Sequence, residues 1–364
     1  MRTPENTHSG ISERGNRLLR QHAISTLSSV KEGLAAINAL SGAAMTLFAV
    51  TPEGLLAGTV TDGDIRRAII SGIGLDDTLE KVMHKDFLAA NPDDDLCLTI
   101  AEGRRRRLSL LPVVESGHIV DIIDLQSVKT FLPIDAVLMA GGRGERLRPL
   151  TLTTPKPLLE VGGKPIIDYN IEELESCGVK NIFVTVNYLA EQIIEHFDKR
   201  KGNAIVECIL EPKRLGTIGS LALIDSFTSE DVLLMNSDLL TGIDFEAFYL
   251  KHKRSHADVT MAAVPYTVSV PFAILHLEGE RVIGLEEKPT YNYFANAGVY
   301  LIKRDLLKRI VKGEFLDAPD FVENIISDGG KVECFPVQGT WIDIGSPDDY
   351  RHANEMMSHS LLKK

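Results

Sequence analysis

The sequence lacks several features that would point to particular classes of protein. Four cysteines occur in 364 residues, Cys97, Cys177, Cys208 and Cys334, and none belongs to a CxxC pair. This spacing indicates neither a disulfide framework nor a zinc site, and it is typical of a reducing compartment. No run of 18 apolar residues occurs, and the first 21 residues contain no apolar segment like that of a signal peptide. We therefore expect a cytoplasmic protein without a membrane span.

The chain also lacks a net positive charge. It carries 39 Lys and Arg residues against 51 Asp and Glu residues, a formal net charge of −12 at pH 7. Because an acidic chain binds polyanions poorly, we expect neither nucleic acid nor an anionic membrane surface as a partner. Any phosphate group that this protein binds must then be met by a local cluster of cations or by a metal ion.

The length and composition predict two folded domains. Hydrophobic residues make up 44% and charged residues 25% of the chain, which is the balance of a globular protein. A chain of 364 residues is too long for one typical core. The apolar and polar pattern changes near Pro133, so we predict one domain over residues 1–132 and another over residues 133–364.

Residues 1–132 contain a weak internal repeat of about 60 residues. Each copy reads as a helix, two short strands and a second helix. The predicted elements are helices at 30–37, from Asp62, at 94–102 and from Gln126, and strands at 46–50, 56–60, 110–114 and 119–123. This order resembles a tandem pair of CBS domains (cystathionine-β-synthase type), and Leu111-Pro112-Val113-Val114 resembles the family's second-copy strand. The resemblance implies an α+β regulatory module.

The CBS resemblance also implies an adenine-nucleotide effector site in the first copy. Gly58–Asp64 matches the family's G-h-h-[ST]-x-x-D turn, in which Thr61 would bind a phosphate and Asp64 the ribose hydroxyls. The second copy lacks these groups at 121–127, so we expect one site per chain. The alternative is that Thr61 and Asp64 only cap a helix, since Thr and Asp are common there.

Residues 133–364 alternate short apolar runs with helical patterns. The runs at 136–140, 182–187 and 232–235 are typical of strands buried on both faces of a parallel sheet. Residues 165–177 predict a helix that ends at Gly178. We therefore predict an α/β domain with a mainly parallel, Rossmann-like sheet. Since such sheets bind ligands beyond the carboxyl ends of their strands, the residues after each run are candidate site residues.

A glycine loop follows the first of these strands. Gly141-Gly142-Arg143-Gly144 leads to Arg146 and then to Thr154-Pro155-Lys156-Pro157. The loop lacks the GxxxxGK[ST] of a P-loop and the third glycine of the dinucleotide fingerprint. Its bare backbone can still approach a phosphate chain, and Arg146 and Lys156 supply cations. A tight turn with solvated arginines is the alternative, and the downstream Thr-Pro-Lys-Pro favours the phosphate site.

This region resembles the signature of sugar-1-phosphate nucleotidyltransferases, G-G-x-G-[T]-R-L-x-P-L-T…P-K-P, of the mannose-1-phosphate guanylyltransferase type. The resemblance runs from about Asp135 to Tyr350. It departs at Glu145, where Thr is commoner, and we expect that carboxylate to point away from the site. Five further segments follow in the family's order, at 211–219, 236–238, 286–289, 296–300 and 341–347.

The resemblance implies a role for particular residues. Arg146, Lys156, Asp238 and Lys288 would be catalytic. Nucleotide contacts would come from Met139, Ala140, Gly141, Gly142, Gly144, Glu211, Gly216 and Thr217. The sugar phosphate would be bound by Glu287, Lys288, Asn296 and Gly298. Mg²⁺ would be held by Asp238 and Asp343, whose oxygens are the hard ligands that this ion prefers.

The implied reaction is attack of a sugar-1-phosphate oxygen on the α-phosphorus of an NTP, which yields an NDP-sugar and pyrophosphate. The second pKa of a phosphomonoester is near ~6, so the nucleophile is already an anion and needs no general base. The remaining task is to bring two anions together, which requires Mg²⁺ and fixed cations. The implied product would serve as a precursor of surface glycans or nonulosonates.

The choice of base rests on Glu211. A carboxylate only accepts hydrogen bonds, and guanine offers two adjacent donors, so GTP is favoured over UTP or dTTP. The alternative from another class is a sensor that binds these ligands without reacting, and the intact charged residues argue against it. The sugar stays open among mannose-, heptose- and hexosamine-type phosphates. Because CBS pairs commonly associate, we also expect a homo-oligomer.

Overall fold

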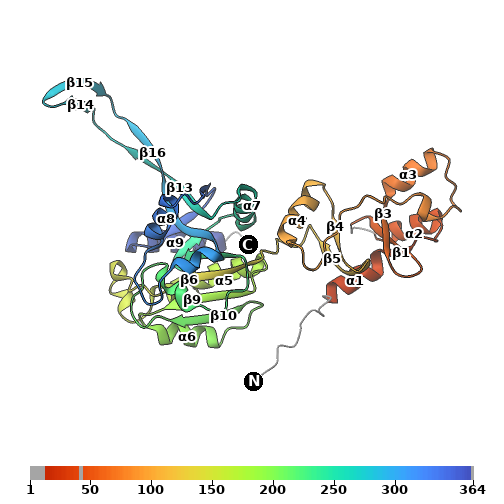
Figure 1. Ribbon diagram of the computed structural model, residues 1–364, viewed down its shortest axis with the longest axis horizontal. Coiled ribbons are helices and arrows are strands. Elements are labelled where there is room, and N and C mark those ends of the chain that lie inside the picture. The colour runs from red at the N-terminus through yellow and green to blue at the C-terminus, as the bar shows by residue number, and fades with distance from the viewer. Residues whose placement is uncertain (1–12, 41–43, 362–364) are drawn as a thin grey trace. The chain divides into compact units, whose positions relative to one another are not determined.

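The computed structural model describes residues 13–40 and 44–361 of the chain (Figure 1). The chain forms two compact units, one that ends at Thr130 and one that begins at Phe131, two residues before the predicted boundary. Residues 1–12, on which the prediction about signal peptides partly rests, lie outside the described residues. Within the described part, no helix is long and apolar enough to cross a lipid bilayer.

The first unit contains two antiparallel hairpins, β2–β3 and β4–β5. Each hairpin gains a short parallel neighbour: β1 lies beside β2, and Ala90 bridges to Val113 of β4. This repeated arrangement matches the predicted internal repeat. The elements are α1 (Glu13–His22), β1 (Ala23–Ser25), α2 (Val30–Ala39), β2 (Thr46–Val50), β3 (Leu56–Thr61), α3 (Asp62–Ile70), α4 (Leu96–Arg105), β4 (Leu110–Glu115) and β5 (His118–Asp124).

The helix predicted from Gln126 is wrong. Residues 125–127 form a turn instead. Asp124 causes this, because its carboxylate accepts the Gln126 backbone N–H at 3.1 Å, and its carbonyl accepts the Ser127 hydroxyl at 3.2 Å. Such local side-chain bonds compete with helical hydrogen bonds. The second copy of the repeat therefore has a turn at the position where the first copy begins helix α3.

The second unit is built around a seven-stranded mixed sheet in the order β10-β9-β6-β11-β16-β13-β17. Four of the six strand pairs are parallel, and β16 runs antiparallel to both its neighbours. This confirms the α/β fold. The strands are β6 (Ile134–Met139), β9 (Asn181–Val186), β10 (Ile205–Leu210), β11 (Asp231–Asn236), β13 (Val259–Ser269), β16 (Thr290–Lys303) and β17 (Val332–Pro336).

The helices and short strands of this unit cover the sheet and form its loops. The helices are α5 (Ile166–Ser176), α6 (Ala190–Asp198), α7 (Phe245–Ser255), α8 (Ala318–Ser327) and α9 (Pro347–Leu361). The short strands are β7 (Glu160–Val161), β8 (Lys164–Pro165), β12 (Leu239–Thr241), β14 (Ile274–Glu278), β15 (Arg281–Glu286) and β18 (Trp341–Asp343). Helix α5 ends before Gly178, whose φ of 78° supplies the predicted left-handed stop. Central strands such as β6 are buried at 0% exposure over Ala136–Leu138, as expected for strands covered on both faces.

Strands β13 and β16 continue beyond the sheet as a two-stranded ribbon, which carries the β14–β15 hairpin at its far end (Figure 1). We call residues 264–296 the arm. The ladder is continuous from the pair Ala263–Asn296 to the pair Ser269–Thr290. The arm is therefore a direct extension of the sheet.

Candidate active site

Four neighbouring parallel strands bring their carboxyl ends to one edge of the sheet. In the order β10, β9, β6, β11, the next residues along the chain are Glu211, Asn187, Ala140 and Ser237. Parallel strands place these positions together, as the sequence predicts for a ligand site. Met139 ends β6, and Ala140 is held by its N–H to the Thr185 carbonyl at 2.9 Å. Both residues thus lead directly into the glycine loop.

The glycine loop is shaped by contacts that exclude side chains. Gly144 has a φ of 59°, and a Cβ there would lie 2.8 Å from the Thr151 methyl group. A Cβ on Gly141 would lie 2.9 Å from Oε1 of Glu211. Gly142, in contrast, has nothing within 4 Å of its Cβ position, so its backbone faces open space. The loop therefore offers bare backbone for close approach of a ligand.

Two carboxylates and one ammonium group meet beside this loop. Lys156, at the start of η4 (Lys156–Leu158), donates to Oδ2 of Asp238, and its Nζ lies 3.8 Å from Oδ1 of Asp343. The pairing of Leu239 in β12 with Asp343 in β18 brings the two aspartates together. The side chains of Lys156 and Asp238 are only 12% and 19% exposed. The structure thus assembles three residues that lie up to 187 positions apart.

The electrostatics of this cluster suit a cation. Burial raises the pKa of Asp343 above its ordinary value, and the charge of Asp238 raises it further, while Lys156 and Arg146 oppose the shift. Oδ1 of Asp238 is buried and has no hydrogen-bond partner among the described residues. A buried carboxylate oxygen without a partner is costly unless a ligand completes it. The donor set of Asp238 and Asp343 therefore fits Mg²⁺.

Arg146 reaches this cluster from η2 (Glu145–Leu147). A Cβ on Gly345 would lie 3.2 Å from the Arg146 guanidinium, so the glycine leaves room for that side chain. Arg146 is exposed and free to meet an incoming anion. The neighbouring Glu145 carboxylate is 63% exposed, and its Oε1 lies 3.8 Å from Nη2 of Arg148.

Glu211 is buried at 6% exposure next to the glycine loop. Its Oε2 accepts the Leu215 N–H at 3.2 Å, and Asn187 donates to its backbone carbonyl at 3.0 Å. Burial raises the pKa of this carboxyl, and bonds from Leu215 and Thr185 oppose the shift. Glu211 therefore holds its own loop in place as well as facing the candidate nucleotide site.

Gly216 and Thr217, predicted as nucleotide contacts, also pack against the segment that leads into α8. Gly216 has a φ of 81°, and a Cβ there would overlap the carbonyl of Leu316. The Thr217 hydroxyl accepts the Ala318 N–H at 2.7 Å and donates to Asp317 at 3.2 Å. Both residues thus fasten the 211–219 loop to the start of α8. These contacts give both residues a packing role, and their predicted contacts with a nucleotide stay a prediction.

The four residues predicted to bind the sugar phosphate fall into two places. Asn296 and Gly298 lie where the arm joins the sheet, and a Cβ on Gly298 would collide with the Asn236 side chain, next to Asp238. Trp341 donates to the Ala297 carbonyl at 3.0 Å and ties this segment to β18. Glu287 and Lys288 are exposed on the arm, beyond Thr290, which is itself about 20 Å of strand from Asn296. The structure does not bring these two to the aspartates.

Asn170 is a positioning residue that the sequence reasoning missed. It is 4% exposed on α5, and its Nδ2 donates to the carbonyls of Ser237 at 3.3 Å and Leu239 at 3.0 Å. These carbonyls flank Asp238. Ser237 in turn donates its hydroxyl to the Met139 carbonyl at 2.6 Å, which joins β11 to β6. The available signal was a single asparagine on the apolar face of a helix.

In the first unit, the residues predicted to bind an adenine nucleotide cap α3. The Thr61 hydroxyl accepts the Asp64 N–H at 3.3 Å, and Oδ2 of Asp64 accepts the Thr61 N–H at 2.8 Å. Oδ1 of Asp64 pairs with Arg67 at 2.5 Å. Both carboxylate oxygens are thus engaged without a ligand, which is the geometry that the capping interpretation predicts.

Comparison with known proteins gives a second line of evidence beside the geometry of the site. The nucleotidyl transferase family matches residues 135–360, which is more than half of the chain. The chain is 32% identical over 243 residues to a mannose-1-phosphate guanyltransferase of Emericella nidulans, and 31% identical over 238 residues to one of Yarrowia lipolytica. Each alignment covers 63% of this chain and 65% of the relative, so the chain spans less than two thirds of their length.

A solved structure has a similar fold. The crystal structure of HddC from Yersinia pseudotuberculosis matches with a TM-score of 0.50 and 26% sequence identity. The matched region covers 61% of this chain and 99% of the HddC chain. The size of this match corresponds to the second unit alone.

Proposed function

The chain belongs to the nucleotidyl transferase family, and on that premise we propose that it transfers a nucleotidyl group from an NTP to a sugar 1-phosphate. The products would be an NDP-sugar and pyrophosphate. The observation that carries this proposal is the cluster of Lys156, Asp238 and Asp343 beside a glycine loop with open backbone at Gly142.

The residues of the site supply what the reaction needs. The glycine loop and Arg146 would bind the triphosphate, whose charge calls for backbone N–H groups and a guanidinium. Lys156 would hold a phosphate oxygen when it exchanges its carboxylate partners for the substrate. Asp238 and Asp343 would hold Mg²⁺, which when bound would neutralise charge on the phosphates. No residue needs to act as a general base, because a sugar phosphate is an anion at neutral pH.

GTP is the favoured nucleotide in this proposal. The carboxylate of Glu211 lies against Gly141 with Oε1 on the loop side, where it would accept the two donors of guanine. The names of these two relatives, mannose-1-phosphate guanyltransferase, agree with GTP and suggest mannose 1-phosphate as the sugar substrate. Asn296 and Gly298 would form the sugar side of the site. The role of Glu287 and Lys288 in binding the sugar phosphate rests on the family resemblance.

A substrate matrix tests this proposal. The full chain is incubated with Mg²⁺, each of four NTPs and a panel of sugar 1-phosphates, and pyrophosphate release is measured. We expect release with GTP and a mannose-type phosphate. Glu211→Gln should weaken GTP use and improve UTP or dTTP, because an amide offers a donor as well as an acceptor. A clear preference of the unmodified enzyme for UTP or dTTP would contradict the assignment of Glu211.

We further propose that the first unit is a CBS-type regulatory module that binds an adenine nucleotide at Thr61 and Asp64. The repeated hairpins support the module. Binding would require Asp64 to exchange its bond to Arg67 for the ribose. Calorimetry with AMP and ATP tests the proposal. We expect stoichiometric binding that Asp64→Ala removes. If no heat is detected at millimolar nucleotide, Thr61 and Asp64 serve only to cap α3.

A further inference from the structure

The arm exposes an unusually large apolar surface. Ten large hydrophobic side chains on it are at least 38% exposed: Tyr266, Val268, Phe272, Leu275, Leu277, Val282, Ile283, Leu285, Tyr293 and Phe294. An aromatic side chain covers roughly 150–250 Å² and an aliphatic one somewhat less, so at these exposures the ten expose on the order of 1,000 Å², counted over both faces of the arm. The largest apolar patch of a typical monomer is only about 300–600 Å². A surface of this size calls for a partner.

The register of the ribbon sorts its side chains onto two faces, because cross-strand partners share a face and successive residues alternate. One face carries the pairs Val264–Ala295, Tyr266–Tyr293 and Val268–Tyr291. The other carries Pro265–Phe294, Thr267–Asn292 and Ser269–Thr290. The ribbon is therefore amphipathic, with Phe294 as the large apolar side chain of the more polar face. Such alternation is typical of a sheet with one buried face.

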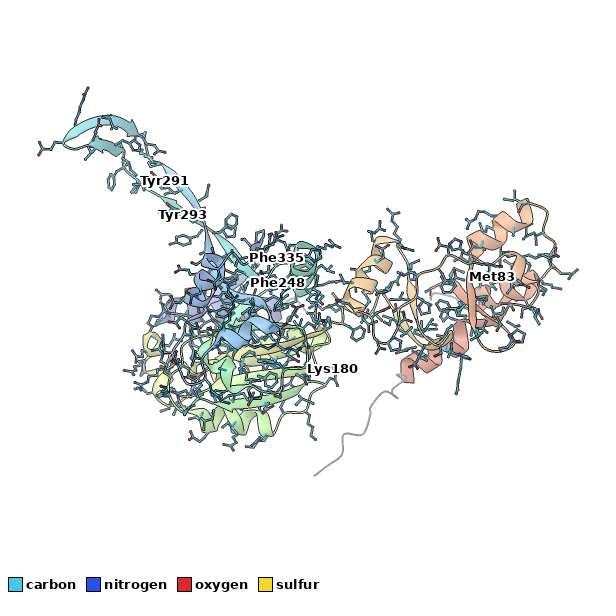
Figure 2. All side chains as sticks on the ribbon, viewed as in Figure 1. Met83, Lys180, Phe248, Tyr291, Tyr293 and Phe335 are labelled. Carbon is cyan, nitrogen blue, oxygen red and sulfur yellow. The ribbon has the colours of Figure 1, made fainter. Side chains whose placement is uncertain are left out.

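The aromatic side chains of the apolar face lie together. The rings of Tyr291 and Tyr293 have centroids 6.5 Å apart, and Figure 2 shows both on the ribbon, outside the body of the unit. The β14–β15 hairpin repeats the pattern, since Leu275 pairs with Leu285 and Leu277 with Val282. Two-stranded segments of this kind are marginally stable unless another layer covers them.

The arm also has free edges. Strand β11 pairs with β16 only from Val299 onward, and β17 pairs with β13 only as far as Ala263. Past these points, the described residues provide no further strand beside the ribbon. Its outer backbone groups can therefore pair with an added strand.

We propose that the arm is a self-association surface and that its partner is the arm of a second copy of this chain. A two-fold axis brings the same patch of both copies together, so a single amphipathic face is enough. The exposed apolar area of the whole arm, both faces counted, is of the same order as the roughly 800 Å² per partner of a standard interface. The strand pairs on the apolar face of the ribbon include no charged residue, and the nearest carboxylate, that of Glu286, accepts the Tyr291 hydroxyl at 3.4 Å at the outer end of this face. This proposal is independent of the transferase chemistry.

Molar mass in solution tests the proposal. The full chain is measured by light scattering after gel filtration, from 1 to 100 μM, beside the double variant Tyr266→Ser/Tyr293→Ser. We expect the unmodified chain to self-associate and the double variant to show half its mass at the same concentration. Both tyrosines are more than half exposed, so their loss should leave the fold unchanged by circular dichroism.

Phe294→Ser is the matched control, because it removes an aromatic side chain that is 65% exposed from the opposite face of the same ribbon. It should keep the mass of the unmodified chain. An unmodified chain that is monomeric at 100 μM would overturn the proposal, since the arm would then be covered by its own chain or by another partner. An assembly that survives the double variant, or that Phe294→Ser disrupts equally, would also overturn it.

Discussion

Asp238 binds Lys156 through one carboxylate oxygen, while its other oxygen is buried without a hydrogen-bond partner among the described residues. The single positive charge of Lys156 therefore offsets one of the two negative charges that Asp238 and Asp343 carry. The ammonium group is the only cation held between Asp238 and Asp343 in the part of the chain that the structure describes. Lys156 thus substitutes for positive charge that the substrate complex would receive from a metal ion.

Lys156→Met should separate these two roles of the lysine. Without substrate or metal, we expect lower stability, because two carboxylates then face each other without a counter-charge. Mg²⁺ should stabilise this variant more than the unmodified chain, since the competing ammonium is gone. Turnover should fall by about 10²-fold or more, because a fixed cation at the phosphates is lost. Thermal melts in EDTA and in Mg²⁺ measure the two stability effects, and a rate assay measures turnover. If Mg²⁺ raised the melting temperatures of the variant and the unmodified chain equally, Lys156 would not compete with the metal ion.

Asp343→Asn should change how stability depends on pH. The pKa of Asp343 is raised from 3.8 by burial and by Asp238, so rising pH deprotonates the unfolded chain before the folded one. In EDTA, this carboxyl therefore lowers stability as pH rises through its raised pKa, and the asparagine variant escapes that loss. At pH 7 the variant should be at least as stable as the unmodified chain, yet lose the gain from Mg²⁺, which is about 2.7 kcal/mol at 100 times the Kd.

Denaturation by urea at pH 4 and pH 7 measures this effect. Trp341 is the single tryptophan of the chain, and it lies in the second unit, so its fluorescence reports the unfolding of that unit. A variant that is less stable than the unmodified chain in EDTA at pH 7, or that keeps the full gain from Mg²⁺, would count against Asp343 as a buried metal ligand.

Asn170→Ala should lower turnover, although Asn170 would act through the backbone around Asp238 and not through a contact with the substrates. It leaves the carbonyls of Ser237 and Leu239 without their donor, which costs about 1–3 kcal/mol of stability, and frees the backbone that holds Asp238. We expect kcat to fall with little change in KM. Asn181→Ala is the control, because Asn181 bonds Asp135 at the opposite end of the strands. If both variants lose stability and neither loses kcat, Asn170 has no positioning role.

Gly216→Ala should be far more destabilising than Gly163→Ala. The two glycines have φ values of 81° and 82°, so alanine strains both backbones alike, by roughly 1–2 kcal/mol. Only at Gly216 does the added Cβ also collide with the Leu316 carbonyl, whereas nothing lies within 4 Å at Gly163. Urea denaturation followed by Trp341 fluorescence compares them. Equal losses would mean that the close contact between Gly216 and Leu316 does not constrain the loop.

The apolar runs of the second unit predicted its strands because those strands are buried on both faces. Asp238 was predicted from its place after a strand and from the family resemblance, and Asp343 from the resemblance alone. The helix predicted from Gln126 was wrong, since the bonds of Asp124 to residues 126 and 127 are local side-chain chemistry that periodicity does not report.

Contacts between distant segments could not be predicted in the same way. The packing of Gly216 against Leu316 joins segments 100 residues apart, and a glycine in a loop looks the same whether a ligand or a backbone approaches it. Likewise, the placement of Lys288 depends on how far the ladder of β13 and β16 extends, and alternation in a strand does not reveal what covers its apolar face.

The most direct test of the whole account is Mg²⁺-dependent pyrophosphate release from GTP and mannose 1-phosphate by the unmodified chain and by Asp238→Asn. Asp348→Asn serves as the control, because Asp348 is 81% exposed at the start of α9. We expect the unmodified chain and the control to release pyrophosphate in step with GDP-sugar, and Asp238→Asn to be slower by about 10²-fold or more. Near-normal release by Asp238→Asn, or no release from any NTP with any sugar 1-phosphate, would contradict the account.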